Sequence, residues 1–313
     1  MLRLKKPSFI ILFLVFVLTL TQTACKKENE LLSSPRLIPS NFDYYFSLDG
    51  PLFLELVPKL EEFVIDKNTL KHLKKTERIY GGLVMAWDGY ADFVLTLIGD
   101  FPQGLIQTGL DMSSDWKKVE GEQKYWLDEW GSEIAPFTGR SIYLTNGRME
   151  DVLAIYTASQ KNELAYWEQD RPLESVSRIV LKDLETGDFV FLGEGDSLFR
   201  ERSMRNITGS LQINPGALKE WSLVLNKYGK GFRGFIYIAF ADVRQARAFV
   251  TSYRLIGRQG STGGREGSNS SSPGLEEIVL SGTVERKDER IYIRDIFLSA
   301  DDLAGFMGSA LGF

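Results

Sequence analysis

The chain has 313 residues with Lys+Arg 37 and Asp+Glu 42, which gives a formal net charge of -5. An acidic chain without a strong basic block is a poor nucleic-acid binder, and its single cysteine excludes a disulfide within one chain. Hydrophobic residues make up 43% of the sequence, which is ordinary for a globular protein and enough to form a core.

The first 24 residues have the layout of a secretory leader. Arg3, Lys5 and Lys6 give a positive start, and Phe9–Leu20 is an almost unbroken apolar run. Small or polar residues then lead to the cysteine, and the apolar run is short for a permanent membrane span. Residues 1–24 are therefore predicted to be a signal peptide. Its removal would leave 34 basic and 42 acidic residues, a net charge of 34 − 42 = −8.

The residues that end this leader resemble the signal peptide of bacterial lipoproteins. In that family the cysteine sulfur is acylated, for example with palmitate, and the chain is cut just before it. Ala24-Cys25 matches the pattern, whereas Gln22 stands where an aliphatic residue is usual, as in the looser spirochaetal forms. The resemblance implies lipidation of Cys25 and a membrane as the partner of this lipid anchor. An ordinary cleaved signal and an uncleaved single-helix anchor are the alternatives.

The segment after the cysteine is polar and predicts a flexible tether, so residues 25–40 are expected to link the lipid to a folded body. No Asp follows Cys25, which by the sorting rule of enteric bacteria favours the outer membrane over the inner one. The body is then expected to be periplasmic or surface-exposed in the cell envelope.

A first α+β half is predicted over residues 41–195. Alternation over Phe42–Asp49 predicts a half-buried strand, and a helix starting at Gly50 should follow it, kinked or divided at Pro58. Two runs rich in β-forming residues, Ile79–Trp87 and Phe93–Phe101, predict a hairpin.

Shorter elements complete this half. A short helix is predicted over Pro102–Leu110, and Asn146 is expected to cap another helix. The remaining predicted elements are strands at Trp116–Val119, Lys124–Trp130 and Arg140–Leu144, a helix at Leu173–Val180 and a strand at Asp188–Leu192.

A second half is predicted over residues 196–313, beginning with a strand at Ile207–Ile213. Asn214-Pro215 should then start a helix buried through Leu218, Trp221, Leu225 and Tyr228. Strand, capped helix and strand thus follow one another near Phe42 and again near Ile207. Internal duplication and a common α+β idiom explain this order about equally well.

The end of the chain alternates strands and helices. The predicted elements are a strand at Phe232–Phe240, a helix capped by Asp242, a low-complexity loop at 260–274, strands at Ile278–Glu285 and Arg290–Leu298, and a helix capped by Ser299. The fold class is therefore α+β, with mixed or antiparallel sheets and packed helices.

Few residues offer catalytic or metal chemistry, and no cofactor or metal is expected. His72, the one histidine, lies in a basic segment that indicates a solvated side chain, which disfavours a triad or zinc site. Asp183, Glu185 and Asp188 could collect calcium, but a plain polar turn is the preferred interpretation.

Asp128 and Glu129 lie among tryptophans, as acids do in glycan-binding grooves. On a strand these two carboxylates would point to opposite faces, so a structural hairpin is favoured over catalysis. Two hypotheses remain. The preferred one is a non-enzymatic lipid-anchored envelope protein that binds a protein, peptide or lipid. The alternative is a carboxylate-dependent hydrolase of envelope glycan.

Overall fold

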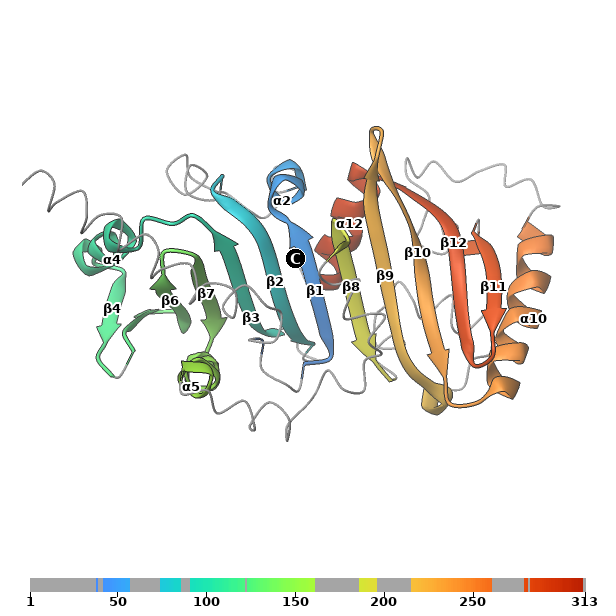
Figure 1. Cartoon of the computed structure of the whole chain (residues 1–313), viewed down its shortest axis with the longest axis horizontal. Helices are drawn as coiled ribbons and strands as arrows, with labels where there is room; N and C mark the ends of the chain where they lie inside the picture. Colours follow the sequence, from blue (N-terminus) through green and yellow to red (C-terminus); the bar gives the residue numbers. More distant parts are fainter. Residues whose placement is uncertain are drawn as a thin grey trace, which may run out of the picture.

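A single antiparallel sheet of twelve strands runs through the described part of the chain (Figure 1). The computed structural model describes residues 38, 42–56, 74–85, 91–121, 123–160, 186–195, 215–260, 279–280 and 282–311. The predicted leader, Cys25 and His72 lie outside these ranges. So do Pro58, the predicted helix Leu173–Val180, the predicted strand Ile207–Ile213 and most of the loop predicted at 260–274.

The fold class is α+β, as predicted, and the strands form one sheet. In chain order they are β1 (Tyr44–Asp49), β2 (Thr76–Met85), β3 (Ala91–Gly99), β4 (Trp116–Val119), β5 (Tyr125–Asp128), β6 (Ser132–Thr138), β7 (Ser141–Asn146), β8 (Phe189–Glu194), β9 (Leu218–Tyr228), β10 (Gly231–Phe240), β11 (Thr283–Lys287) and β12 (Arg290–Ser299). The helices are α2 (Gly50–Leu56), α4 (Gln103–Met112), α5 (Met149–Gln160), α10 (Val243–Gly260) and α12 (Ala300–Leu311), with a 3-10 turn at Pro215–Ala217.

The order of the first five strands is the same when followed outward in either direction from the central pair β1 and β8, and β5 and β4 extend the sheet beyond β6. On one side β1 is followed by β2, β3, β7 and β6, and on the other β8 is followed by β9, β10, β12 and β11. Phe46 pairs with Phe191 at the middle of the β1–β8 register. We call the β1–β7 series the N-terminal half and the β8–β12 series the C-terminal half, which places the division before β8 instead of after residue 195.

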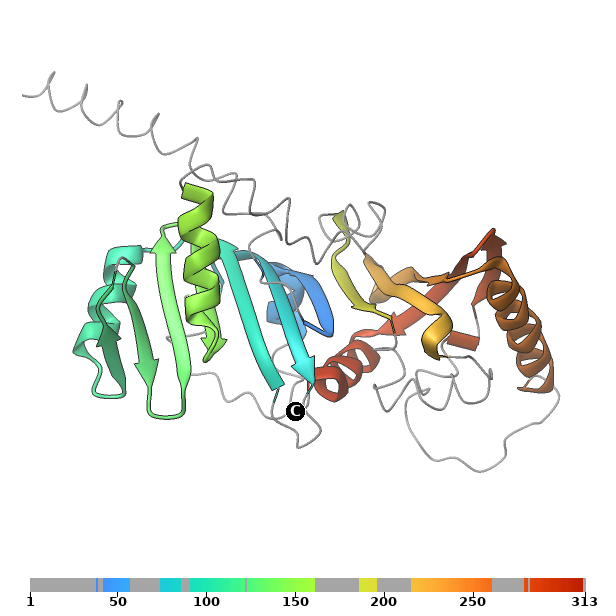
Figure 2. The same cartoon turned by 90° about the horizontal axis from the view of Figure 1, so that it is seen from below.

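Different helices cover the two faces of the sheet. Helices α2, α10 and α12 pack on one face, here called the three-helix face, which carries Tyr44 and Phe46 of β1. Helix α5 packs on the other, here called the α5 face, through residues that include Met149 and Val152. Figure 2 shows α5 lying against the N-terminal half, with α12 near the middle of the molecule and α10 at the far end.

The interior of the α5 face is more polar than that of the three-helix face. Strand alternation and register place seven buried polar residues on it: Ser47, Thr96, Glu133, Ser141, Thr145, Glu220 and Ser222. On the three-helix face the register places the buried Thr76, which pairs with Gly99. On the α5 face Glu133, Thr145 and Glu220 make side-chain hydrogen bonds, whereas the Thr96 and Ser222 hydroxyls have no partner among the described residues.

Many predicted elements are confirmed. The strands at β1, β4, β8, β10 and β12, the β2–β3 hairpin and helices α2, α4, α10 and α12 lie where the sequence patterns indicate. Asp242 Oδ1 accepts from Gln245 N at 2.9 Å and caps α10. Ser299 Oγ accepts from Asp302 N at 3.1 Å at the start of α12, and Asp302 Oδ2 accepts from Ser299 N at 2.9 Å, which makes a capping box.

Other predictions are wrong. The helix predicted from Asn214 is a 3-10 turn followed by strand β9, whose residues Leu223 and Val224 are both buried on opposite faces. Strand β1 is buried on both faces, not one, because it lies at the centre of the sheet. Strand β6 was not predicted, and β11 begins at Thr283 instead of Ile278.

Candidate interaction surface

The two acids proposed for glycan chemistry lie at the turn between β5 and β6. Asp128 Oδ1 accepts hydrogen bonds from Trp130 N at 2.9 Å and from Ser132 N at 2.7 Å. Glu129 is exposed, and the Trp130 side chain is 84% exposed. Asp128 therefore holds the turn in the manner of an Asx turn, which fits the structural interpretation of this hairpin.

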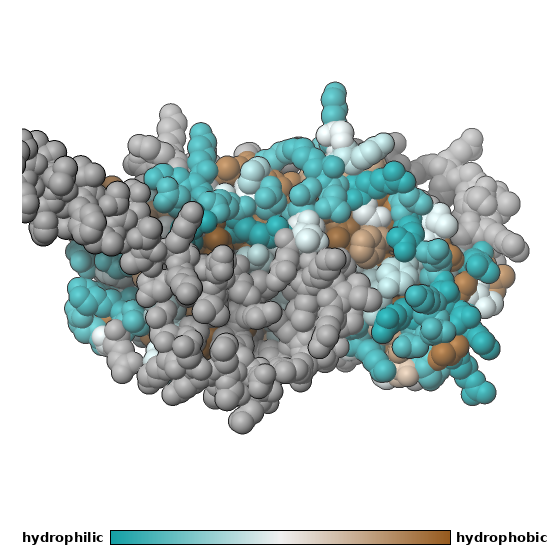
Figure 3. Space-filling model, in the orientation of Figure 1, coloured by the Kyte–Doolittle hydropathy of each residue, from teal (hydrophilic) through white to brown (hydrophobic). Residues whose placement is uncertain are grey.

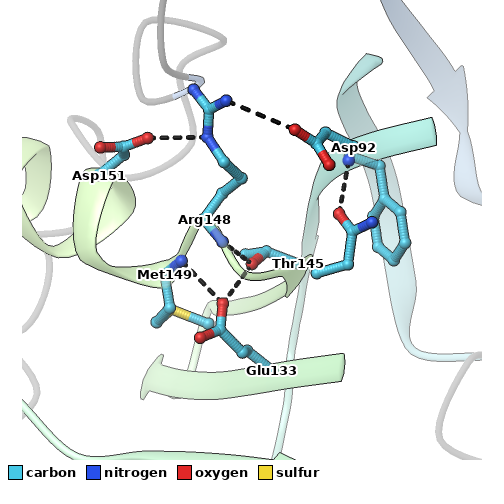
Figure 4. Close-up of polar contacts among 8 residues, drawn as sticks. Asp92, Glu133, Thr145, Arg148, Met149 and Asp151 are labelled. Carbon is cyan, nitrogen blue, oxygen red and sulfur yellow. Dashed lines mark hydrogen bonds and ion pairs between the residues drawn. The ribbon is translucent and has the colours of Figure 1, made fainter. Parts of the chain in front are cut away.

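A buried carboxylate on the α5 face caps α5 from a neighbouring strand (Figure 4). Glu133 Oε2 accepts from the Thr145 hydroxyl at 2.7 Å and from Met149 N at 2.8 Å. Thr145 Oγ1 accepts from Arg148 N at 3.0 Å. The cap predicted at Asn146 is wrong, because Asn146 Oδ1 accepts from Phe93 N on β3 at 2.7 Å. Glu133 thus fixes the first turn of α5 to the sheet.

Arg148 extends this network toward solvent. Its Nε donates to Asp151 Oδ2 at 2.8 Å, and its Nη1 lies 3.8 Å from Asp92 Oδ2. Its guanidinium carbon lies 5.4 Å from the centre of the Phe42 ring. Figure 4 shows the Arg148 guanidinium between Asp151 of α5 and Asp92 of β3. The network joins α5, β3, β6 and β7, so its acids hold the fold together.

A second charged cluster lies where the two halves meet. Asp188 Oδ2 accepts from Lys227 N at 2.6 Å, and Lys227 Nζ pairs with Glu55 Oε2 at 2.5 Å. The pKa of Asp49 is raised, chiefly by burial and secondly by the Asp188 carboxylate, although Arg78 opposes the shift. Asp188 was a calcium candidate with Asp183 and Glu185, both of which lie outside the described residues. In the part of the chain that is described, no group of three or more His, Cys, Asp or Glu could hold a metal.

The C-terminal half has no covering helix on its α5 face in the described ranges. Strands β9, β10, β12 and β11 are neighbours there, while α10 and α12 pack on the opposite face, behind the strands in Figure 1. Strand register places a set of exposed and half-buried side chains on this open face, here called the aromatic–ion-pair surface. Its members are Tyr228, Arg233, Phe235, Glu285, Tyr292, Arg294, Asp295 and Phe297.

A β-bulge in β12 builds the ionic part of this surface. Gly234 pairs with Ile296 and Ile236 with Ile293, so Arg294 and Asp295 together oppose one residue of β10. Asp295 has φ 61, a left-handed conformation that Asp adopts more readily than most other non-glycine residues. Arg294 and Asp295 are both exposed, whereas consecutive strand residues normally point to opposite faces.

Each of the two bulge residues forms an ion pair with a neighbouring strand. Arg233 Nη2 on β10 lies 2.5 Å from Asp295 Oδ1, and Arg294 Nε lies 2.6 Å from Glu285 Oε2 on β11. The hydrogen bond that Arg233 donates to Asp295 raises the pKa of Arg233 above its usual range. These four side chains carry two positive and two negative charges, so the two ion pairs together are neutral. The same registers place the cationic side chains of Lys287 and Arg290 on this face.

Aromatic rings lie beside both ion pairs. The Arg233 guanidinium is 5.7 Å from the Tyr228 ring centre, and the Arg294 guanidinium is 5.2 Å from that of Tyr292. Tyr228 is 59% exposed and Phe297, which pairs with Arg233, is 54% exposed. The surface therefore offers planar apolar groups next to fixed donors and acceptors.

Figure 3 views the molecule from the α5 face. The described residues seen there are mostly hydrophilic, with hydrophobic residues scattered between them instead of gathered in one continuous patch. This surface suits a ligand that has both polar and apolar groups. The sequence patterns did not reveal it, because pairing between distant strands and the bulge assemble it.

No helix in the described ranges has the length and apolarity needed to cross a membrane. The fold and this open surface together define an α+β protein built on one twelve-stranded antiparallel sheet. No family model matches the chain, and no curated protein matches it.

Solved structures do match the chain. It is similar to crystal form III of TP0453, with 14% identity and a TM-score of 0.54 over 88% of this chain and 98% of the other. Crystal form I gives 13% identity and a TM-score of 0.53 over 89% and 97%. Crystal form IV gives 15% identity and a TM-score of 0.54 over 88% and 96%. At these identities the similarity shows a shared fold.

Proposed function

We propose that the protein is a lipid-anchored protein of the cell envelope that acts by binding a ligand through the aromatic–ion-pair surface. The observation that carries this proposal is the group of exposed side chains on the α5 face of β9–β12, where Tyr228 and Phe297 are more than half exposed. Exposed aromatic residues beside arginine are typical of binding surfaces, where they supply most of the affinity. The outer membrane is the proposed location.

The lipid anchor rests on the leader and Ala24-Cys25. Lipidation would keep the body at the membrane while its sheet stays in water, since acyl chains alone supply the membrane affinity. Phase partitioning in a detergent that separates on warming tests this part. The native protein should enter the detergent phase with an N-terminal mass that reports a diacylated or triacylated cysteine. Cys25→Ser should retain the leader or lack the lipid, and an unmodified native N-terminus would contradict the anchor.

The binding part is tested with the purified lipidated protein, immobilised in detergent and mixed with envelope extract in the same detergent. Phe297→Ala removes an exposed ring of the surface, and Leu105→Ala removes an exposed side chain of α4 in the N-terminal half, where Leu105 is 71% exposed. Capture of envelope material should fall roughly ten-fold or more for Phe297→Ala, as expected for a central aromatic contact, and stay unchanged for Leu105→Ala. Equal capture by both variants would contradict this role.

The alternative of a glycan hydrolase has no comparable support. Asp128 uses its carboxylate to hold the β5–β6 turn, and Glu133 uses one carboxylate oxygen to cap α5. A pair of acids that handles protons must be free to exchange them with a substrate. The hydrogen bonds of Asp128 therefore disfavour a proton-transfer role for this residue, which leaves the binding proposal as the preferred one.

A further inference from the structure

We infer that the outer side of helix α10 docks on an anionic phospholipid bilayer and turns this end of the body toward the membrane. This helix packs on the three-helix face, so its outer side is separate from the aromatic–ion-pair surface. Only the lipid anchor of the proposed function is needed here. The acyl chains hold the protein at the membrane, and α10 sets which end of the body faces the lipid.

The negative charge of the protein is confined to its first half. Residues 41–187 contain 15 basic and 25 acidic residues, a net charge of 15 − 25 = −10. Residues 188–313 contain 16 basic and 15 acidic residues, a net charge of 16 − 15 = +1. An anionic surface therefore repels the N-terminal half much more strongly than the C-terminal half, which favours one orientation of the body.

Helix α10 concentrates positive charge at the end of the C-terminal half (Figure 1). Its 18 residues include four arginines and no acidic residue. Three of these arginines are exposed on one side of the helix and are here called the arginine row: Arg244, Arg247 and Arg254. None of the ion pairs in the described part of the chain involves this row. The arginine row is therefore available to an anionic partner.

Acids near α10 lie at its start and do not neutralise the arginine row. Asp242 caps the helix by accepting from Gln245 N. The β11–β12 turn at residues 287–290, which is hydrogen-bonded to the end of β10, carries two acids and two bases. The register places Arg286 of β11 on the face that α10 covers, and its guanidinium donates to the backbone carbonyl of Asp288. The charge around α10 is therefore positive.

Helix stability does not account for these arginines. Arg244 is the second residue of α10, where the positive end of the helix dipole disfavours a cation. Exposed helix faces gain stability from acids and bases spaced three or four residues apart, and α10 has no acid with which to form such a pair. An anionic partner explains the arginine row better.

The apolar side of α10 is already used within the fold. Phe249, Val250 and Tyr253 are buried in the core of the three-helix face, and the Tyr253 hydroxyl donates to Val279 O at 2.7 Å and to Gly282 O at 2.9 Å. This side could enter a bilayer only if the helix left the core. The outer side can instead lie on lipid headgroups, where arginine binds phosphate oxygens.

The expected strength of the contact favours a bilayer over a free polyanion. An arginine beside an anionic membrane surface raises the affinity roughly five-fold, so the arginine row raises it about a hundred-fold. An affinity of that size does not hold a polyanion from dilute solution. It is enough to orient a body that its lipid already keeps beside the bilayer, where the local concentration of headgroups is high.

The chain is long enough for the lipid and α10 to reach the same bilayer. Ile38 is 3% exposed and belongs to the apolar cluster of the α5 face, which fixes this point of the chain to the body. The chain from Cys25 to Ile38 can span at most about 45 Å. Five strand spacings separate β1 from β11, a distance of about 24 Å, and α10 packs against β10, β11 and β12.

The test measures how close α10 lies to headgroups in vesicles that carry the lipidated protein. The single cysteine, Cys25, carries the lipid on its sulfur, so Thr251→Cys gives one free thiol beside the arginine row. Leu105→Cys gives one in the N-terminal half as control. A donor dye on each thiol transfers energy to acceptor-labelled headgroups in phosphatidylcholine vesicles with or without phosphatidylglycerol. Phosphatidylglycerol should raise transfer from position 251 roughly two-fold or more, and salt should reverse the rise. Transfer from position 105 should not rise.

Two triple variants with the same net charge assign the effect to α10. One carries Arg244→Gln, Arg247→Gln and Arg254→Gln, and the other carries Lys74→Gln, Lys75→Gln and Lys117→Gln, which change exposed lysines of the N-terminal half. The arginine variant should lose the rise in transfer, and the lysine variant should keep it. Changing the arginine row to lysine should also keep the rise, because a bilayer surface responds to charge. All three should unfold near the native temperature, since the changed side chains are exposed.

The outcomes separate this inference from the proposed function. Transfer from position 251 that ignores phosphatidylglycerol, or that rises equally in the arginine-to-glutamine variant, would overturn the docking role of α10 and leave the lipid anchor standing. Release of position 251 from the vesicles by inorganic polyphosphate would assign the arginine row to a free polyanion and would also overturn it. Native protein that leaves pure phosphatidylcholine vesicles would contradict the anchor and the docking role together.

Discussion

The two halves of the sheet share one strand order from the centre out to β6 and β11, yet the helices that follow β7 and β12 pack on opposite faces. Helix α5 follows β7 and covers the α5 face of the N-terminal half, whereas α12 follows β12 and packs with α2 on the three-helix face. The start of α5 is tied to the sheet by Glu133 of β6, while α12 is capped by its own Ser299 and Asp302. A change in how one helix is capped accompanies the change of face, and no helix in the described ranges covers the α5 face of the C-terminal half.

The pair β1 and β8 suggests why the halves resemble each other. Residues 43–50 read Asp-Tyr-Tyr-Phe-Ser-Leu-Asp-Gly, and residues 188–195 read Asp-Phe-Val-Phe-Leu-Gly-Glu-Gly. Aligning these segments matches Phe46 with Phe191, the two residues that pair at the centre of the sheet. We propose that the halves derive from a duplication whose units start at β1 and β8. The sequence pattern at Phe42 and Ile207 left duplication and a common α+β idiom equally open, and Ile207 lies outside the described residues.

The largest expected effect tests the position of α12. Phe306 is 7% exposed and packs edge-on against Phe189 and Phe191, at ring-centre distances of 6.3 and 5.4 Å. Phe306→Ala should lower the free energy of unfolding by about 3–5 kcal/mol, because it opens a cavity in the core. Urea unfolding measures this loss. Phe297→Ala is the matched exposed control, expected within about 0.5 kcal/mol of native. Similar losses for both would show that α12 does not pack as described.

The next effect tests the attachment of α5. Glu133→Ala should cost about 2–3 kcal/mol, because the Thr145 hydroxyl and Met149 N lose their shared acceptor in a buried site. Glu133→Gln should cost less, since its amide oxygen can still accept. The control is Glu129→Ala, which removes an exposed carboxylate from the turn before β6. The unfolding midpoint of this variant should stay near that of the native protein. A larger loss for Glu129→Ala than for Glu133→Ala would refute the capping role.

The self-contained cap of α12 should matter less. Ser299→Ala removes the acceptor for Asp302 N and should cost about 1 kcal/mol, the usual value for an N-cap. Chemical denaturation is again the measurement, with the exposed Ser114→Ala as control. A loss as large as that of Glu133→Ala would mean that the two helices are attached in the same way, contrary to the comparison of the halves.

The smallest effect concerns the joint between the halves. Burial raises the pKa of Asp49 above 3.8, so ionisation of this carboxyl opposes folding at pH values above its pKa in the folded protein. Asp49→Asn keeps an acceptor for Leu52 N and should raise the melting temperature at neutral pH. The gain should disappear below pH 3.8, where the native carboxyl is protonated in both states. Melting curves across this range, with exposed Asp115→Asn as control, check the sign. A gain that grows at low pH would contradict it.

Local patterns predicted much of the fold. Alternation located β10 and β12, and caps located α10 and α12, because these signals lie within a few residues of the element they define. Strand β9 was predicted as a helix because Leu218, Trp221 and Leu225 also fit a helical spacing. A strand buried on both faces lacks the polar alternation that would have corrected this error. Strand β6 contains Pro136, a residue that is unusual inside a strand. The strand accommodates this proline next to a register shift between Ala135 and Thr138.

The candidate surface was beyond local patterns. Arg233, Glu285 and Asp295 come from three strands, and the bulge at Asp295 is set by the register with β10. The sequence did place aromatic and acidic residues together at Trp126–Trp130. There the structure assigns Asp128 to a turn. Side chains brought together by distant strand pairing can be recognised only when the register is known.

The central claim is that the open face of the C-terminal half is the contact surface of the protein in the envelope. Site-specific photo-crosslinking in intact cells tests it most directly, with p-benzoylphenylalanine placed at Phe297 or, as control, at Leu105. Both sites are more than half exposed, at 54% and 71%. Irradiation should give a slower-migrating adduct from position 297 and none from position 105. Adducts from position 105 alone, or from neither position, would contradict the account.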